Sequence, residues 1–209
     1  MIKKTHYYDL SLTEIKNISQ QAKKPRILLH VCCAPCSCFP LLFLAPYFEM
    51  TIYYNNSNIY PQTEYHKRKK ELERYLEILK KNDNIIIPLI EPDYDSTFQE
   101  KLAIYANEPE GGKRCHLCYS LRMEEAFKYA HDNDFDYFCT IMTISRQKDS
   151  FILNQIGKDL SPKYPNTKYF FSDFKKKNGI IQGQTICKKN NLYCQNYCGC
   201  SYSYNNTKT

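Results

Sequence analysis

The sequence predicts a single-domain α/β protein with a mainly parallel, Rossmann-like sheet flanked by helices. Short apolar runs alternate with amphipathic runs along the chain, which is typical of strands joined by crossover helices. Polar or turn-forming residues follow each apolar run, so each expected strand has a clear end. The length of 209 residues suits one domain that buries a core of its own.

The first expected strand covers residues 26–31, which are apolar and lie between Pro25 and Pro35. Four more strands are expected, at 50–54, 85–90, 136–140 and 169–171. Helices are expected at 39–48, 61–81, 96–106 and 150–158, and another begins near Cys115. Right-handed crossovers bring the carboxyl ends of such strands to one sheet edge, where ligands bind in open α/β sheets. We therefore expect the functional site there.

The expected domain covers residues 26–204. Residues 1–25 form an N-terminal extension with one amphipathic helix, and residues 205–209 form a polar tail that is expected to be frayed. No apolar run reaches the length of a membrane span, and the N-terminus lacks the apolar stretch of a secretory signal. We therefore expect a cytoplasmic protein with no membrane partner.

The formal net charge of +7 comes from 29 Lys and Arg against 22 Asp and Glu. Such an excess favours an anionic partner, of which nucleic acid is the commonest. The basic clusters at 67–70, 175–177 and 188–189 are candidates for contacts with an RNA backbone. Each cluster is also compatible with an ordinary solvated face.

The 11 cysteines are the most informative feature of the composition. Structural disulfides are rare in a reducing compartment, so this number favours metal binding or redox catalysis. Cys32 and Cys33 follow the first expected strand. Cys115 and Cys118 lie at the start of a helix, where free backbone N–H groups and the helix dipole favour thiolates.

A Cys-Cys pair and a Cys-x-x-Cys pair together provide four thiolates, which suit either a tetrahedral zinc site or a [4Fe–4S] cluster. Spacing alone does not distinguish the two. The polar residues expected at the same edge, among them Asn58, Arg146 and Asp173, favour a reactive site and therefore the cluster. A metal site at the carboxyl ends of the strands is thus the central expectation.

Cys198-Gly199-Cys200 is a separate signal, because two thiols around one glycine form an easily reduced disulfide or chelate a second metal. Cys36 either packs at a helix start or is a third ligand beside the cluster. The other cysteines, Cys38, Cys139, Cys187 and Cys194, are expected to be packing residues or incidental thiols.

The segment at 29–37, Leu-His-Val-Cys-Cys-Ala-Pro-Cys-Ser, resembles the opening motif of the QueH-type epoxyqueuosine reductases. Four further segments resemble motifs of the same family in the same order, at 54–61, 108–119, 143–149 and 197–203. The resemblance covers residues from about 26 to 204 and leaves the N-terminal 25 residues outside it.

The resemblance implies an oxidoreductase that reduces the epoxide of epoxyqueuosine, at the wobble position of tRNA, to queuosine. This is the last step of tRNA queuosine biosynthesis, and it removes one oxygen as water with two electrons and two protons. Enzymes of this family work without cobalamin. The implied partners are a tRNA substrate and an electron donor, and the sequence does not identify the donor. The modified base must leave the anticodon loop stack to reach the site.

The resemblance also implies roles for individual cysteines. Cys32, Cys33, Cys115 and Cys118 would hold a [4Fe–4S] cluster. Cys198 and Cys200 would be a catalytic redox-active pair, or would help to hold a second, mononuclear iron next to the cluster.

Some members of the family have Asp at the position of Cys36. If that Asp is a ligand of the extra iron, Cys36 replaces it here. A general acid must protonate the leaving oxygen, and Asp149, Asp173 and Tyr197 are the candidates.

Two other functions fit parts of the sequence. A cluster-dependent tRNA thiolase would need a glycine-rich phosphate loop after the first strand, where this chain has Cys-Cys-Ala-Pro-Cys. A zinc-stabilised RNA-binding domain without catalysis would need no Cys-Gly-Cys pair, and it would be colourless.

Overall fold

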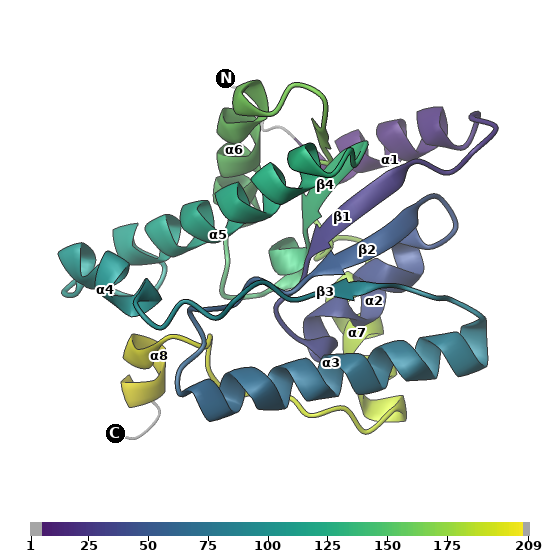
Figure 1. Cartoon of the computed structure of the whole chain (residues 1–209). Coiled ribbons are helices and arrows are strands. Elements are labelled where there is room, and N and C mark those ends of the chain that lie inside the picture. The colour runs from purple at the N-terminus through teal and green to yellow at the C-terminus, as the bar shows by residue number, and fades with distance from the viewer. Residues whose placement is uncertain (1–5, 207–209) are drawn as a thin grey trace.

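A computed structural model describes residues 6–206 and shows one parallel sheet between two layers of helices (Figure 1). The five strands are β1 (Arg26–His30), β2 (Glu49–Tyr53), β3 (Leu89–Ile90), β4 (Tyr137–Thr140) and β5 (Lys168–Tyr169). Their order in the sheet is β3-β2-β1-β4-β5, and every pairing is parallel. This confirms the predicted α/β fold class. The chain order reverses between β1 and β4, which is where ligands bind in such sheets.

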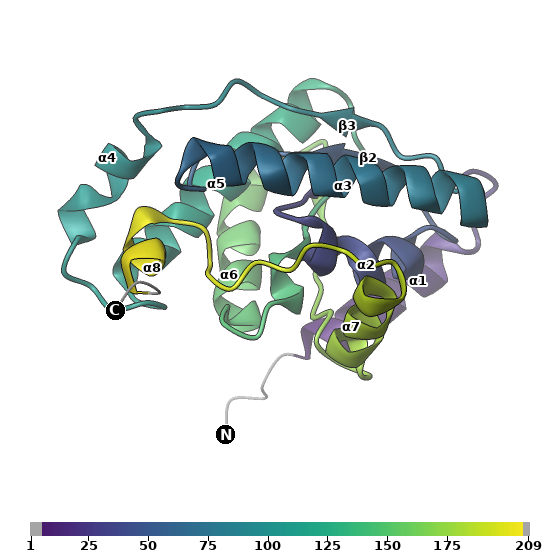
Figure 2. The ribbon, with the colours of Figure 1, turned by 90° about the horizontal axis from the view of Figure 1, so that it is seen from below.

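The helices are α1 (Tyr7–Ile18), α2 (Ala34–Leu44), α3 (Gln62–Asp83), α4 (Phe98–Leu102), α5 (Lys113–Asp132), α6 (Ser150–Leu160), α7 (Gly179–Lys189) and α8 (Ser201–Asn206). Short 3-10 turns lie at η1 (Ala103–Tyr105), η2 (Ile141–Ile144) and η3 (Ser161–Lys163). Helices α1, α2, α3 and α7 cover one face of the sheet, and α5 and α6 cover the other (Figures 1 and 2).

Two apolar clusters fill the spaces between the sheet and these helix layers. Ile27 and Leu29 of β1 point into the first cluster with α1, α2 and α3, and Leu28 points into the second with α5 and α6. All three side chains are fully buried. This double burial explains why β1 is continuously apolar and does not alternate.

The structure corrects several expected boundaries. Helix α2 begins at Ala34, five residues before the expected start, because Pro35 fits the first helical turn, where no backbone N–H is required. The expected strand at 85–90 is reduced to Leu89–Ile90. Pro88 cannot donate a ladder hydrogen bond, although its carbonyl accepts from the Ile52 N–H at 2.8 Å.

The expected helix is present at the N-terminal end, and additional helices are present at the C-terminal end. The helix expected in the N-terminal extension is present as α1, and its Ile15 and Ile18 are buried in the first apolar cluster. Helices α7 and α8 were not expected. Residues 205 and 206 of the tail belong to α8, whereas 1–5 and 207–209 lie outside the described residues. Within residues 6–206, no helix combines the length and the apolar character that a membrane span requires.

Candidate metal centre

Three cysteines meet where β1 ends and α2 begins. The Sγ atoms of Cys32, Cys33 and Cys36 all lie within 4.8 Å of one another. Cys33 has extended backbone geometry and precedes the first turn of α2, so that turn returns Cys36 to the other two thiols. The structure therefore makes Cys36 a full member of this group, which is called the thiol trio below.

The three thiols of the trio shift one another's pKa values. Cys32 receives hydrogen bonds from the Cys33 and Cys36 thiols, and this holds its pKa well below the usual range. The same hydrogen bond raises the pKa of Cys33 to about 12, and burial adds to the increase. A metal ion could take the place of these protons, since metals bind the thiolate form of cysteine.

A second set of cysteines comes from the start of α5 and from the Cys-Gly-Cys segment. Electrostatic interactions couple both Cys115 and Cys118 to Cys198 and Cys200, so the structure brings these four residues to one region. The Gly111 N–H donates to Cys115 Sγ at 3.2 Å, as expected near a helix start. Burial nevertheless outweighs this donor and raises the pKa of Cys115, and it raises that of Cys118 to about 12. The helix start thus supplies the expected N–H donor to Cys115, and burial opposes its effect on the pKa.

Lys148 interacts with both sets of cysteines. Its side chain is only 8% exposed. Burial would lower the pKa of Lys148, but its electrostatic interactions with Cys198 and Cys32 outweigh burial and raise it. Lys148 belongs to the 143–149 motif, but no role was expected for this lysine. Its burial among thiols is a tertiary feature that the local sequence does not reveal.

A buried network supports the ends of β1 and β2 beneath the thiol trio. The Arg122 guanidinium donates to the Asn55 carbonyl at 3.2 Å and to Asn56 Oδ1 at 2.5 Å, and it lies 3.1 Å from His30 Nε2. The other ring nitrogen of His30 lies 3.1 Å from Thr140 Oγ1. Burial and the Arg122 charge lower the pKa of His30 to about 3, so this histidine is neutral. His30 is therefore a packing residue with satisfied nitrogens, as a histidine beside cysteines more often is.

Residues 190–200, which we call the C-terminal strap, run along α3 from α7 to α8 (Figure 2). Buried Arg68 pairs with Glu64 at 2.7 Å and donates to the Cys198 carbonyl at 3.2 Å. Gln195 Nε2 lies 2.9 Å from Cys33 Sγ, so the strap reaches the thiol trio directly. Arg68 belongs to the basic cluster at 67–70, and neither its burial nor the contact of Gln195 was expected.

Gly199 has a φ of +136°, which favours glycine between the two cysteines of the Cys-Gly-Cys segment. A Cβ atom at this position would lie 3.2 Å from Arg68 Nη1 and 3.3 Å from Asn58 Nδ2. Among residues 6–206, Asn58 Oδ1 is one of the buried side-chain atoms that lack a hydrogen-bond partner. Asn58 therefore lies next to the Cys-Gly-Cys segment, a neighbour that the sequence did not predict for it.

The candidate acids are largely occupied by structural contacts. The Asp149 carboxylate caps α6 by accepting from the Phe151 N–H at 2.7 Å. The Tyr197 hydroxyl donates to the Tyr60 carbonyl at 2.6 Å, and burial raises its pKa to about 12. Asp173 is buried and accepts from the Lys175 backbone N–H at 3.3 Å.

The lysines of the two C-terminal basic clusters differ in exposure: Lys175 is half-buried, and the others are exposed. Lys175 Nζ donates to the carbonyls of Thr143, Ser145 and Lys148 at 2.9, 3.3 and 3.0 Å, so it holds the loop that carries Lys148. The exposed members of the two C-terminal clusters are Lys176, Lys177, Lys188 and Lys189.

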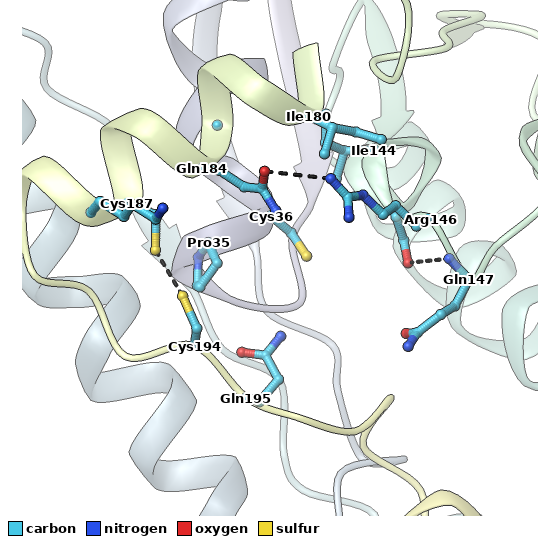
Figure 3. A pocket seen from close by; sticks show the side chains of 13 residues that line it. Pro35, Cys36, Ile144, Arg146, Gln147, Ile180, Gln184, Cys187, Cys194 and Gln195 are labelled. Carbon is cyan, nitrogen blue, oxygen red and sulfur yellow. Dashed lines mark hydrogen bonds between the residues drawn. The ribbon is translucent and has the colours of Figure 1, made fainter. Parts of the chain in front are cut away.

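A cavity of about 570 Å³ opens beside Cys36 (Figure 3). Its wall includes Arg146, which lies 3.4 Å from Gln184 Oε1 and is exposed. Gln147 and Gln195 also line it. The cavity thus offers two cations, Arg146 and Lys188, and several amides next to the thiol trio.

A family model described as epoxyqueuosine reductase QueH matches residues 27–206. The chain belongs to the QueH family. It is 35% identical over 198 residues to the epoxyqueuosine reductase QueH of Streptococcus pyogenes serotype M1, an alignment that covers 94% of this chain and 77% of that protein. It is 38% identical over 202 residues to the QueH of Staphylococcus epidermidis, covering 94% and 84%. These matches confirm the family that the sequence motifs indicated.

One solved structure with a similar fold is the U34-tRNA thiolase NcsA from Methanococcus maripaludis with its [4Fe-4S] cluster. The TM-score is 0.51 at 12% sequence identity, and the match covers 93% of this chain and 67% of the thiolase. At this identity the likeness shows a shared fold and nothing further about the QueH-family chain.

Proposed function

We propose that this QueH-family protein reduces the epoxide of epoxyqueuosine in tRNA to the alkene of queuosine. The observation that carries the proposal is the meeting of the thiol trio with Lys148 at the carboxyl ends of the strands. The reaction consumes two electrons and two protons and releases the oxygen as water. A redox-active metal site next to a cavity suits this chemistry.

The proposed cofactor is a [4Fe–4S] cluster held by Cys32, Cys33, Cys115 and Cys118. The donor set suits it: Cys32 already favours the thiolate, and the buried cations of Lys148 and Arg122 offset further negative charge. When bound, a cluster supplies single electrons, and an iron with an open position acts as a Lewis acid.

The remaining site cysteines have proposed roles beside the cluster. Cys198 and Cys200 act as a redox-active pair or as ligands of an additional iron. Cys36 belongs to the thiol trio and faces the cavity, so it is placed to join that second iron.

The proposed substrate site is the cavity beside Cys36. Arg146 supplies a cation for a phosphate, and the amides of Gln147 and Gln184 supply donors and acceptors for a base that has left its stack. The exposed lysines at 176–177 and 188–189 are placed to hold the RNA backbone, which makes binding dependent on salt.

The test is a turnover assay on protein purified without oxygen. The protein is mixed with tRNA that contains epoxyqueuosine and with dithionite, and the tRNA is digested to nucleosides for mass spectrometry. The proposal predicts loss of one oxygen from the modified nucleoside. Unchanged epoxyqueuosine with protein that contains a full cluster would refute the reductase function.

The roles of the cysteines are tested with two serine variants. Cys198→Ser should retain most of the iron and sulfide but lose turnover, because this thiol is proposed to act in catalysis. Cys32→Ser should lose the cluster itself, because its thiolate is a proposed ligand. Full turnover by Cys198→Ser would remove that cysteine from the mechanism.

A further inference from the structure

Two cysteines outside the proposed metal site lie in direct contact. Cys187 is in the last turn of α7, and Cys194 is in the C-terminal strap. Their Sγ atoms are 2.8 Å apart, compared with 3.8 Å between Cys32 and Cys33 (Figure 3). Both residues line the cavity that also contains Cys36. Both residues were expected to be packing residues or incidental thiols, and the structure instead brings their sulfur atoms into direct contact.

The two thiols differ in accessibility. Cys194 is exposed, whereas Cys187 is only 5% exposed. Burial raises the pKa of Cys187 to about 12, and its hydrogen bond with Cys194 adds to the increase. The Leu192 carbonyl lies 3.7 Å from Cys187 Sγ and 3.6 Å from Cys194 Sγ. The Cys194 thiol is therefore accessible to reagents in solution, and the buried Cys187 thiol is in contact with it.

We propose that Cys187 and Cys194 form a second dithiol site, separate from Cys198 and Cys200, that exchanges with small disulfides such as oxidised glutathione. An exposed attacking thiol with a resolving thiol in contact is the arrangement that such exchange requires. The cationic side chains of Arg146 and Lys188 line the same cavity, and they would attract the carboxylates of glutathione.

The exchange proceeds in two balanced steps. The Cys194 thiolate attacks one sulfur of the disulfide R–S–S–R, which forms a Cys194–S–S–R bond and releases RS⁻. The Cys187 thiolate then attacks Cys194 Sγ, which forms the Cys187–Cys194 disulfide and releases the second RS⁻. The two thiol protons pass to the leaving thiolates, so one disulfide is reduced to two thiols while the dithiol is oxidised.

Closure of this disulfide would fasten the C-terminal strap to α7. Gln195, the residue after Cys194, lies 2.9 Å from Cys33 Sγ through its side-chain nitrogen. The same strap carries Cys198 and Cys200. Oxidation of Cys187 and Cys194 would therefore restrain Gln195, which contacts the thiol trio at Cys33.

The test uses thiol mapping and requires no tRNA. Protein purified without oxygen is incubated with oxidised glutathione, quenched with acid, alkylated and digested without reductant. Trypsin cuts after Lys188 and Lys189 and so separates the two cysteines, and chymotrypsin cuts after Tyr193 and Tyr197 and isolates Cys194 from Cys198. We expect a linked peptide that joins Cys187 to Cys194, with alkylation of Cys187 reduced on the order of tenfold.

Two variants make the assignment specific. In Cys194→Ser, Cys187 should stay fully alkylated, because the exposed attacking thiol is gone. In Cys139→Ala, which removes a buried thiol whose sulfur lies 3.6 Å from Ser172 Oγ, the linked peptide should still form. Linkage of Cys194 to Cys36 or Cys198, or unchanged alkylation of both thiols, would overturn the proposal. Because turnover is not measured, these outcomes do not depend on the proposed reductase function.

Discussion

Replacing Arg122 with methionine should destabilise the protein more than almost any other single change near the site. The Arg122 side chain is only 2% exposed. It donates to the Asn55 carbonyl and to Asn56 Oδ1, and it contacts His30 Nε2. Methionine fills a similar aliphatic volume, so the change removes mainly the guanidinium. Asn56 Oδ1 then loses its donor, and the Asn55 carbonyl and His30 Nε2 keep their contact with each other at 3.2 Å.

The expected loss follows from these contacts. A hydrogen bond to a charged group contributes about 1.5–3 kcal/mol, and the Arg122 guanidinium donates two such bonds to neutral acceptors. We therefore expect the free energy of unfolding to fall by about 3–5 kcal/mol. For a domain of this size the midpoint of thermal unfolding should fall by roughly 10 °C.

Urea unfolding followed by circular dichroism measures this loss on protein without metal. The matched control is Lys128→Met on the same helix, because Lys128 is exposed and forms a surface ion pair with Asp132. The control should leave the midpoint unchanged. A loss below about 1 kcal/mol for Arg122→Met, which is the size of a surface ion pair, would refute the reasoning that this network supports the strand ends.

Three further predictions concern the site, the RNA surface and the strap. Cys36→Ser should keep about four iron and four sulfide but lower turnover at least about tenfold; loss of sulfide would instead make Cys36 a cluster ligand. Alanines at 176–177 should weaken tRNA binding and flatten its salt dependence by about one unit per lost phosphate contact, whereas Lys175→Ala should lower stability with an unchanged slope. Hydrogen bonds from Arg74 and from the Tyr193 N–H lower the pKa of Glu71 below its usual 4.5. The stabilisation that ionised Glu71 gives to the strap is therefore complete above pH 4.5, and it is lost as the pH falls through the lowered pKa. In that pH range the hydrogen-exchange rate of the Tyr193 amide should rise by more than the intrinsic pH dependence of exchange predicts. If Glu71→Gln gave the same dependence of this rate on pH as the unmodified protein, the role of Glu71 would be contradicted.

The order of the elements could be predicted because local patterns specify them. Strand β1 is recognisable from its apolar run between two prolines. Helix α5 is recognisable from the apolar stripe of Met123, Ala126, Phe127 and Ala130. Helix α7 could not be predicted, because Gly179 and Gly183 are weak helix formers. Both glycines pack against Phe39 of α2, and a Cβ at Gly179 would lie 1.9 Å from the Phe174 carbonyl. That helix depends on a contact between distant segments.

The site was predictable in its cysteines and less so in its other side chains. Cys32, Cys33, Cys115 and Cys118 were recognisable from their spacing and from the family motifs, and their role as ligands stays a prediction. Arg68, Lys148 and Gln195 have ordinary local sequence surroundings. Their importance comes from burial and from contacts across the fold, such as that between Arg68 and the Cys198 carbonyl. The contact between Cys187 and Cys194 depends on how the strap returns along α3.

The measurement that tests the central claim most directly is the iron and acid-labile sulfide content of protein purified without oxygen. The proposed [4Fe–4S] centre predicts about four iron and four sulfide per chain, or slightly more iron, in a brown protein whose absorbance dithionite bleaches. One zinc per chain with no sulfide, in protein purified and kept without oxygen, would contradict the proposed [4Fe–4S] cluster and favour a structural zinc site.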